Sequence, residues 1–449
     1  MAIFTMDPEE DLTAEKLKEF IEEHKTRIPR YDLLDNMYRG NHEILGMDQK
    51  EMGKPDNRLV VNFAKYIVDT LNGYFVGNPI KTVHPEKTVA DKMKLIAKRN
   101  SQNDNNAELS KMCSIYGHAY EFVYQDEEAD TRVTYIRPQE AFVIYDNTIG
   151  QRPLFGVRLI YDKEGKLSGT IYSKTYEQNF NENDKGELVI ESKAKEHYFG
   201  DVPLIEYIEN EERQSAFESV ISLINAFNKA LSEKANDVDY FADAYLLILG
   251  VELDEDTIKK VRDNRIMNMK NGDTNNIVVE FLDKPNADST QENLINRLQD
   301  LIFQIAMVAN ISDENFGASS GISLKYKLQP MENVALMKER KFNAGMMQRF
   351  KMMFTIPTNF GADKESYLDI DYIFTRNIPN NILEEADAAS KLTGVIPKRT
   401  QLGMLSVVDN VQDELDELER ERDEQALNSF NRDVNTPFRN EVVTDGQEE

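Results

Sequence analysis

Apolar residues recur at helical spacing in two long segments that a short polar stretch separates. In residues 291–310 they recur every three or four positions, which is the period of an amphipathic helix. The same spacing returns in residues 322–354, where Pro330 predicts a kink or a delayed start of the helix. Between them, residues 316–321 hold two glycines and two serines, which leave the backbone free. The pattern therefore predicts two helices joined by a mobile loop.

Helical periodicity also predicts several helices earlier in the chain. They are residues 12–36, 59–75, 88–100, 107–116 and 213–244. Thr13 is a suitable N-cap for the first helix, and Pro29 predicts that this helix is interrupted or ends there.

Between His118 and about Ile208 the pattern changes to short runs of β-branched and aromatic residues. Residues 162–166 and 183–187 have the composition of hairpin turns between such runs. This part of the chain is therefore expected to form an antiparallel sheet.

A small insert interrupts the helical pattern after residue 244. Two strand-like runs, residues 245–250 and 276–282, flank a short helix expected at residues 254–264. Farther on, a strand is expected at residues 368–374, followed by helices at 382–392, 397–405 and 409–424. The last residues, 426–449, have little to bury and are expected to be disordered.

The chain is strongly acidic, with 53 Lys and Arg against 80 Asp and Glu and a formal net charge of −27 over 449 residues. This charge argues against a general nucleic-acid binder, which has basic excess, but it is compatible with a conduit that lets DNA pass without holding it. Basic residues nevertheless gather after the mobile loop. They are Lys325, Lys327, Lys338, Arg340 and Lys341.

Composition also excludes several kinds of site. A single cysteine, Cys113, excludes an internal disulfide, and five scattered histidines do not suggest a metal site, so neither metal nor cofactor is expected. The first residues are acidic, and no apolar run reaches the length of about 18 residues that a membrane span needs. We therefore expect a soluble protein of a reducing compartment, without a membrane partner.

Three motifs could carry chemistry, and each has a simpler interpretation. Residues 317–321 match the Gly-x-Ser-x-Gly pattern around Ser319, but a hydrolase elbow needs a strand before the serine, whereas a helix is predicted there. Residues 181–186 resemble a calcium loop yet lack its distal glutamate, so a turn is favoured. No Gly-x-x-x-x-Gly-Lys-Ser/Thr loop is present, so any ATP hydrolysis belongs to a partner.

Two smaller clusters are interpreted in the same way. Asp237, Asp239 and Asp243 oppose the dipole at a helix C-terminus and have no His or Cys companion, which favours a charged surface over a metal site. Cys113 and His118 are five residues apart at a helix end, and a buried thiol beside an unrelated imidazole is favoured over a catalytic pair.

Taken in order, four stretches resemble the portal proteins of tailed double-stranded DNA bacteriophages, in the subgroup common in phages of Gram-positive hosts. They are residues 38–42 (YRGNH), 57–80, 239–246, and 320–328 together with 396–402. The resemblance covers nearly the whole chain, and it rests on the order and spacing of the stretches rather than on one motif.

The resemblance implies a mainly helical α+β portal fold that assembles as a ring, typically of twelve subunits. It assigns the parts of the chain as follows: residues 1–212 to a wing, 213–244 and 288–310 to stem helices, 245–287 to a clip, 311–321 to a tunnel loop, 322–380 to a long helix and wing return, 381–425 to a crown, and 426–449 to the disordered tail.

The resemblance also implies a function without enzymatic activity. The ring forms the DNA channel at one capsid vertex of the virion and serves genome packaging, head-tail connection and DNA ejection, after assembly in the host cytoplasm. Its implied partners are double-stranded DNA in the lumen, the large terminase subunit, scaffolding and major capsid proteins, and the head-tail adaptor. The alternative is an acidic oligomeric scaffold or adaptor without a DNA channel.

The implied site residues fall into two groups. The first lines the DNA channel: Phe316, Gly317, Ser319, Ser320, Gly321, Lys325 and Lys327. The second would dock the motor and the adaptor at the clip: Leu247, Ile248, Val251, Val278 and Phe281.

Overall fold

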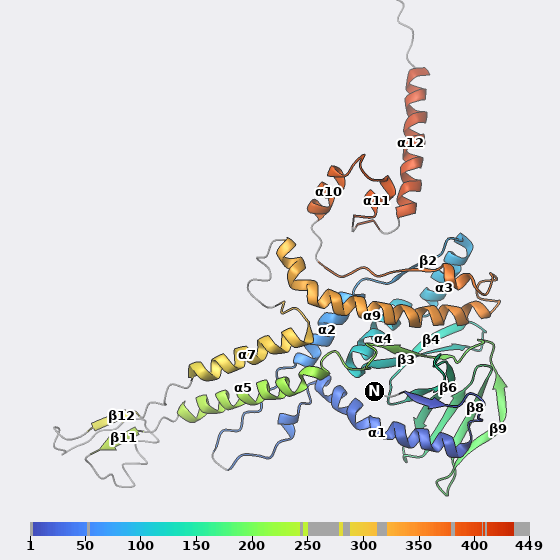
Figure 1. The fold of residues 1–449 in the computed structure, drawn as a ribbon. Helices are drawn as coiled ribbons and strands as arrows, with labels where there is room; N and C mark the ends of the chain where they lie inside the picture. The colour runs from blue at the N-terminus through green and yellow to red at the C-terminus, as the bar shows by residue number, and fades with distance from the viewer. Residues whose placement is uncertain are drawn as a thin grey trace, which may run out of the picture. The chain divides into compact units, whose positions relative to one another are not determined.

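The computed structural model describes residues 3–51, 54–242, 246–249, 278–281, 288–311, 321–378, 382–405, 407–408 and 411–434. The chain divides into two compact units, Met1–Asn377 and Ile378–Glu449. Figure 1 shows the elements of both units coloured along the chain.

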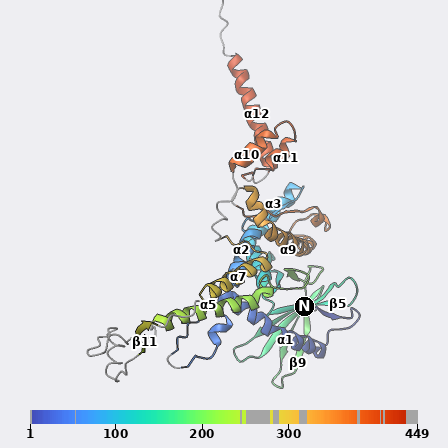
Figure 2. The same ribbon diagram turned by 60° about the vertical axis from the view of Figure 1, so that its left-hand side comes forward.

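The first unit contains a six-stranded sheet in the order β1-β5-β6-β7-β8-β9. Its strands are β1 (Phe4–Met6), β5 (Ala141–Asp146), β6 (Pro153–Tyr161), β7 (Leu167–Tyr172), β8 (Tyr176–Glu182) and β9 (Leu188–Glu196). Helix α1 (Ala14–Arg39) packs on this sheet, because Leu17 and Ile21 join Phe142, Val157 and Ile171 in one buried cluster (Figures 1 and 2).

The predicted antiparallel sheet is confirmed for β5 to β9, and its hairpin turns lie where the composition placed them. Gly165 and Gly186 have φ of 81° and 75°, which glycine adopts at no steric cost. The side chain of Asn183 accepts the N–H groups of Lys185 and Glu187 at 2.9 and 3.0 Å, so it shapes a turn. The short strand β1, which pairs in parallel with β5, was not predicted.

A second sheet and several helices complete the first unit. The second sheet has three strands: β10 (Leu204–Ile208), β3 (His118–Gln125) and β4 (Thr131–Ile136). The helices near it are α2 (Phe63–Val76), α3 (Lys87–Arg99), α4 (Gln102–Tyr116) and α9 (Gly321–Thr355). A small pair of strands, β2 (Lys81–Val83) and β13 (Asp371–Ile373), lies beyond α9. The 3-10 turn η3 (Ser366–Asp369) precedes β13, so the strand predicted at residues 368–374 is shorter than expected.

The prediction that Pro29 interrupts or ends the first helix was wrong. Helix α1 continues through Pro29, with Thr13 as its cap and buried residues on both sides of the proline, among them Ile21 and Leu34. Helix α9 includes Pro330 and begins at Gly321, so its start is not delayed. Its first turns are inclined to the rest of the helix in Figure 1, in line with the alternative of a kink. In each case burial of the flanking helical faces outweighs the one backbone hydrogen bond that proline removes.

The helix predicted from residue 213 begins later. A 3-10 turn, η2 (Glu218–Val220), precedes α5 (Ile221–Ala242). Arg213 itself has a φ of 54°, and two 2.8 Å hydrogen bonds to the Glu206 carboxylate hold its guanidinium. Its backbone N–H donates to Asn210 O at 3.0 Å and its carbonyl accepts from Arg30 at 2.9 Å, so Arg213 lies in a turn with a left-handed conformation that a helix excludes.

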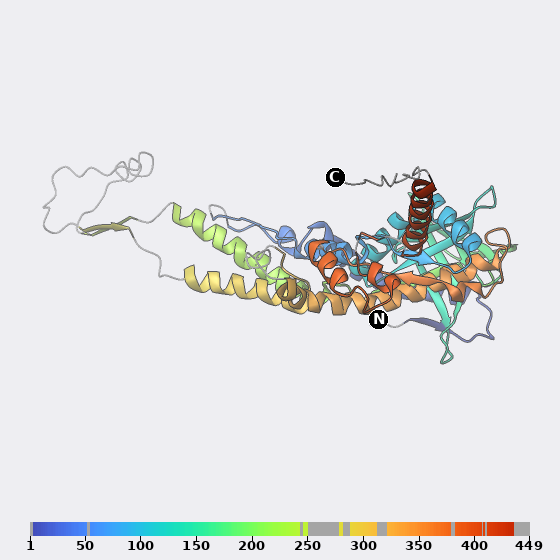
Figure 3. The ribbon, with the colours of Figure 1, turned by 90° about the horizontal axis from the view of Figure 1, so that it is seen from above.

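Helix α5 runs beside α7 (Asp288–Ala306), and the strands β11 (Leu246–Leu249) and β12 (Val278–Phe281) lie beyond their ends (Figures 1 and 3). The two strands were predicted from composition, and the structure pairs them antiparallel, with Leu246 opposite Phe281. The helix expected at residues 254–264 lies outside the described residues.

The second unit contains α10 (Ile382–Lys391), α11 (Lys398–Leu402) and α12 (Val411–Val434). Gly394, with a φ of 82°, follows α10 in the role predicted for it, and Gln401 joins α11 to α10 by a 2.7 Å hydrogen bond to Ala389 O. The expectation of disorder from residue 426 onward was wrong as far as Val434, because α12 continues to that residue.

Candidate functional site

The helix α5 carries three buried polar side chains four residues apart, which we call the polar ladder: Asn228, Ser232 and Asn236. Each accepts a backbone N–H from the extended segment 57–61. The bonds are Val61 N to Asn228 Oδ1 at 2.9 Å, Leu59 N to Ser232 Oγ at 2.9 Å, and Asn57 N to Asn236 Oδ1 at 2.6 Å. Four residues of an α-helix advance about 6 Å, and two residues of an extended segment advance about 6.6 Å. Every second backbone N–H of segment 57–61 therefore lies opposite one of the three side chains on α5.

The polar ladder was missed at the sequence level. Its signal is the i, i+4, i+8 spacing of small polar residues on a helix whose other buried positions are apolar, such as Ile224 and Phe227. Without the partner segment in view, those positions look like a solvated face. The polar ladder fixes α5 against the chain that leads into α2.

Aromatic and polar contacts join the base of α5 to α7. The ring of Phe63, on α2, lies edge-on to Phe227 of α5 and Phe303 of α7, with centroids 4.9 and 5.7 Å apart. Farther along the pair, Lys234 forms an ion pair with Glu292. The helix pair is therefore held at its base by packed rings and along its length by polar contacts.

The segment that follows α7 is anchored by one tyrosine. The Tyr66 hydroxyl accepts the backbone N–H of Ile311 at 2.9 Å and donates to Ala309 O at 3.3 Å. The predicted channel-lining residues begin just beyond this anchor. Phe316, Gly317, Ser319 and Ser320 lie outside the described residues, and Gly321 opens α9.

A second anchor holds α9 on the other side of that segment. Arg376 donates to Glu332 at 3.0 Å and to Glu339 at 2.7 Å, and the Tyr74 hydroxyl donates to Glu332 at 2.6 Å. Both ends of the predicted loop are therefore tied to α2. Among the described residues, α7 is the last element before the loop and α9 the first after it, whereas a nucleophile elbow needs a strand directly before its serine.

The basic residues after the loop do not form one cluster, which corrects the sequence interpretation. Lys325 and Lys327 are exposed on the first turns of α9. Lys338 is instead buried, 2.7 Å from the Glu209 carboxylate, and donates to Ser114 Oγ at 2.6 Å. The helical period turns Lys338 toward the core, because it follows Met331 and Ala335 on the buried face.

A second buried cation lies farther along α9. The Arg349 guanidinium donates to both oxygens of Glu121 at 2.7 and 2.6 Å and to Asn106 Oδ1 at 2.9 Å, and the Tyr207 hydroxyl donates to Glu121 at 2.9 Å. Burial alone would lower the pKa of the arginine, but the Glu121 charge raises it above its usual value. These hydrogen bonds fix α9 to β3.

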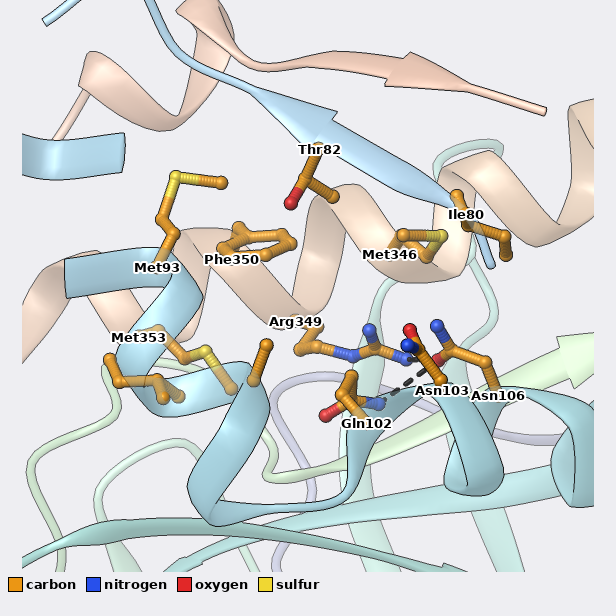
Figure 4. A pocket seen from close by; sticks show the side chains of 12 residues that line it. Ile80, Thr82, Met93, Gln102, Asn103, Asn106, Met346, Arg349, Phe350 and Met353 are labelled. Carbon is orange, nitrogen blue, oxygen red and sulfur yellow. Dashed lines mark hydrogen bonds between the residues drawn. The ribbon is translucent and has the colours of Figure 1, made fainter. Parts of the chain in front are cut away.

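Figure 4 shows a pocket above this arginine, among α3, α4, α9 and β2. Its walls include Met93, Met346 and Met353, and its polar side includes Gln102, which donates to Asn106 at 2.9 Å. The cavity volume is about 40 Å³. That volume holds about three water molecules and is too small for an organic cofactor.

Cys113 and His118 have separate partners, as the simpler interpretation predicted. The Cys113 thiol is buried and lies 3.4 Å from Tyr207 O, and burial raises its pKa. His118 is hydrogen-bonded to Glu206 at 2.7 Å and to the Tyr31 hydroxyl at 2.8 Å. Burial would raise the pKa of Glu206, yet Arg213 and His118 hold it well below its usual range.

The acidic residues near the end of α5 contact polar side chains. Asp237 accepts from Gln291 at 2.9 Å and Asp239 from Asn57 at 2.5 Å, whereas Asp243 lies outside the described residues. In the described part of the chain, no group of three or more His, Cys, Asp or Glu residues could hold a metal ion. No helix in that part is both long and apolar enough to cross a bilayer.

The residues predicted to dock partners lie partly on the small hairpin. Leu247 and Ile248 are in β11, and Val278 and Phe281 are in β12. Val251 lies outside the described residues. The pairing of β11 with β12 brings residues separated by about thirty positions in the sequence onto one hairpin.

The chain is similar to several known proteins. The family model described as "Phage portal protein, SPP1 Gp6-like" matches residues 17–427. The portal protein of Clostridium phage phiCD119 is 23% identical over 434 residues, covering 89% of this chain and 94% of that protein. The portal protein of Bacillus phage SPP1 is 22% identical over 446 residues, covering 91% and 86%. A chain from the neck of a native GTA particle has a TM-score of 0.45 and 10% identity, covering 77% of this chain and 90% of that one.

Proposed function

The chain belongs to the SPP1 Gp6-like family of phage portal proteins, and from this premise we propose that it forms a ring-shaped DNA channel at one vertex of a phage capsid. The match over residues 17–427 is the observation that carries the proposal. In this role the protein is a structural component of the virion rather than an enzyme. It conducts double-stranded DNA during packaging and ejection and connects head to tail, with scaffolding and major capsid proteins around it.

Helix α7 supports the ring because it has apolar residues outside its buried face. Ile295, Leu298 and Ile302 are buried in the first unit, but Leu294 and Ile305 are 52% and 47% exposed. Leu294 and Ile305 are eleven residues apart, which places them on one stripe of the helix beside the buried face. Such a stripe is buried when a neighbouring copy packs on it.

We propose that the segment between the two anchors is the tunnel loop that faces DNA. Its glycines, Gly317 and Gly321, let it follow the DNA surface, and the exposed Lys325 and Lys327 give weak phosphate contacts in an acidic channel. Each contact is salt-sensitive and independent of sequence, so it does not stall translocation.

Stiffening this loop tests the proposal. Replacing Gly317 and Gly321 with valine should leave ring assembly intact and lower the amount of DNA packaged per procapsid, measured as nuclease-protected DNA. Ser319→Ala is the matched control, because it changes the loop's composition without restricting its backbone. Full-length packaging at the wild-type rate by normally assembled double-variant rings would contradict the proposal.

The hairpin of β11 and β12 is proposed as part of the clip that docks the large terminase subunit and, later, the head-tail adaptor. Its short strands leave backbone edges on which a partner strand can pair. Deleting residues 252–275 should leave a ring that no longer retains the large terminase in a pull-down. If rings that lack residues 252–275 retain the large terminase as well as wild-type rings do, the docking site lies outside the deleted residues.

A further inference from the structure

An open groove lies between α9 and the end of the six-stranded sheet at which β6 begins. Its volume is about 680 Å³. Its lining includes Arg152, Leu154, Lys174, Met347, Lys351 and Leu368. The groove is distinct from the regions assigned above to DNA or to the clip, because it is built from the sheet, the second half of α9 and η3.

The groove combines exposed apolar side chains with three cations. Met347 and Leu368 are 41% and 61% exposed. Lys351 is paired with Asp201 at 2.8 Å. A hydrogen bond from Thr148 and the charge of Arg152 lower the pKa of Asp146, which also lines the groove, whereas Lys174 forms no ion pair with any residue that the structure describes. Arg152, Lys174 and Lys351 stand against Asp146 and Asp201 in this lining, so the groove has a small positive balance in a chain whose net charge is −27.

The groove continues along the outward face of α9. Tyr326, Met337, Ala344 and Lys351 follow one another at intervals of eleven, seven and seven residues, which places them on one stripe of the helix. Tyr326 and Met337 are 72% and 58% exposed. From Tyr326 to Lys351 the stripe is about 37 Å long at 1.5 Å per residue. A surface of this length fits a protein face rather than a small molecule.

We propose that the groove and this stripe form a docking surface for an acidic face of a second copy of the chain. The inference rests on the proposed ring, in which each copy presents one surface to a different surface of its neighbour. Copies that each carry a net charge of −27 repel one another, so cations placed at the contact offset the repulsion locally. Met347 and Leu368 provide the apolar centre of the contact and Arg152 and Lys174 its charged rim.

Site-directed photocrosslinking tests the contact directly. Lys174→Cys introduces the one accessible thiol, because Cys113 is buried and 1% exposed. Rings assembled from a mixture of ¹⁵N-labelled and unlabelled full-length chains are labelled with a maleimide-benzophenone, irradiated and analysed by mass spectrometry. Lys163→Cys is the matched control, since Lys163 is exposed in the turn at the opposite end of β6.

We expect crosslinks from Lys174→Cys that join labelled to unlabelled peptides, with acidic target peptides, at least ten times more often than from Lys163→Cys. Rings of normal mass in which Lys174→Cys links copies no more often than Lys163→Cys would overturn the docking surface and leave the ring proposal standing. A wild-type chain that forms no oligomer would overturn the ring, and this inference with it.

A charge-reversal pair gives a second measurement. Arg152→Glu with Lys174→Glu should raise the protein concentration at which half the rings dissociate by at least tenfold, with unchanged circular dichroism of the subunit. Lys163→Glu with Lys185→Glu makes the same charge change in turns away from the groove and should leave that concentration within about twofold. Equal effects of the two pairs would show that net charge alone, and not the groove, governs assembly.

Discussion

Buried charged residues fix α9 to the rest of the first unit. Lys338 contacts Glu209 and Arg349 contacts Glu121, each with side-chain exposures of 4% or less. Removing one partner of such a pair leaves an uncompensated buried charge and costs about 3–5 kcal/mol, whereas an exposed pair such as Lys341 with Glu211 contributes about 0–1 kcal/mol. Two lysines of the same helix therefore differ in their contribution to stability, which is large for Lys338 and small for Lys341.

His24 is a buried residue with a pH-dependent effect on stability. Its Nε2 lies 2.7 Å from Pro138 O, which can only accept, so Nε2 carries a proton. Its Nδ1 is buried with no hydrogen-bond partner among the described residues. A second proton would therefore create a buried cation, and burial lowers the pKa of His24 from 6.5 to about 4.

Because that pKa is lower in the folded state, the unfolded chain binds the proton more readily between about pH 4 and pH 6.5. The contribution of His24 to stability is present above about pH 6.5 and is lost as the pH falls to about 4, by up to about 3 kcal/mol. His24→Gln should reduce the pH slope of the unfolding free energy in this window, measured by urea denaturation at fixed protein concentration. An unchanged slope would show that His24 does not titrate as its burial requires.

At the scale of elements, a substitution in the polar ladder should remove one identifiable hydrogen bond between α5 and segment 57–61. Asn228→Leu leaves the Val61 N–H without its acceptor and removes the 2.9 Å contact with His42 Nδ1. The expected cost is about 1–3 kcal/mol in the urea-denaturation free energy, with faster hydrogen exchange at the Val61 amide.

Lys229→Ala is the matched control, because Lys229 is exposed on the neighbouring position of the same helix. It should change the unfolding free energy by less than about 0.5 kcal/mol. Unaltered protection of the Val61 amide in Asn228→Leu would mean that this hydrogen bond does not hold the segment to α5.

The local sequence pattern was sufficient to predict most helices and the hairpins of the six-stranded sheet. It was insufficient where contacts between distant residues matter: Arg213 lies in a turn that contacts Arg30, and Lys338 is buried against Glu209. The strand β1 has three residues, too few for an alternation to be visible, and its pairing with β5 joins positions far apart in the sequence.

The candidate site was predictable to a smaller extent. The order of elements and the two strands of the small hairpin followed from composition, but the roles of residues such as Gly317 and Val251 came from a family resemblance. The anchors at either end of the loop, Tyr66 and Arg376, carry no local signal, because each acts on a helix distant in the sequence. Their roles are set by tertiary contacts.

At the scale of the whole molecule, we propose that copies of this chain close into a ring. Several helices of the first unit carry exposed apolar residues, among them α7 with Leu294 and Ile305 and α9 with Met337 and Met347. Two separate surfaces per copy are what a head-to-tail ring needs, since each copy has a neighbour on either side.

The most direct test is the mass and shape of the purified full-length protein, by native mass spectrometry with negative-stain imaging at micromolar concentration and physiological salt. Twelve chains of 51.7 kDa make a particle of about 620 kDa, and we expect closed rings at or near that mass with a central opening. A monodisperse species of one chain's mass, with its secondary structure intact, would contradict the account.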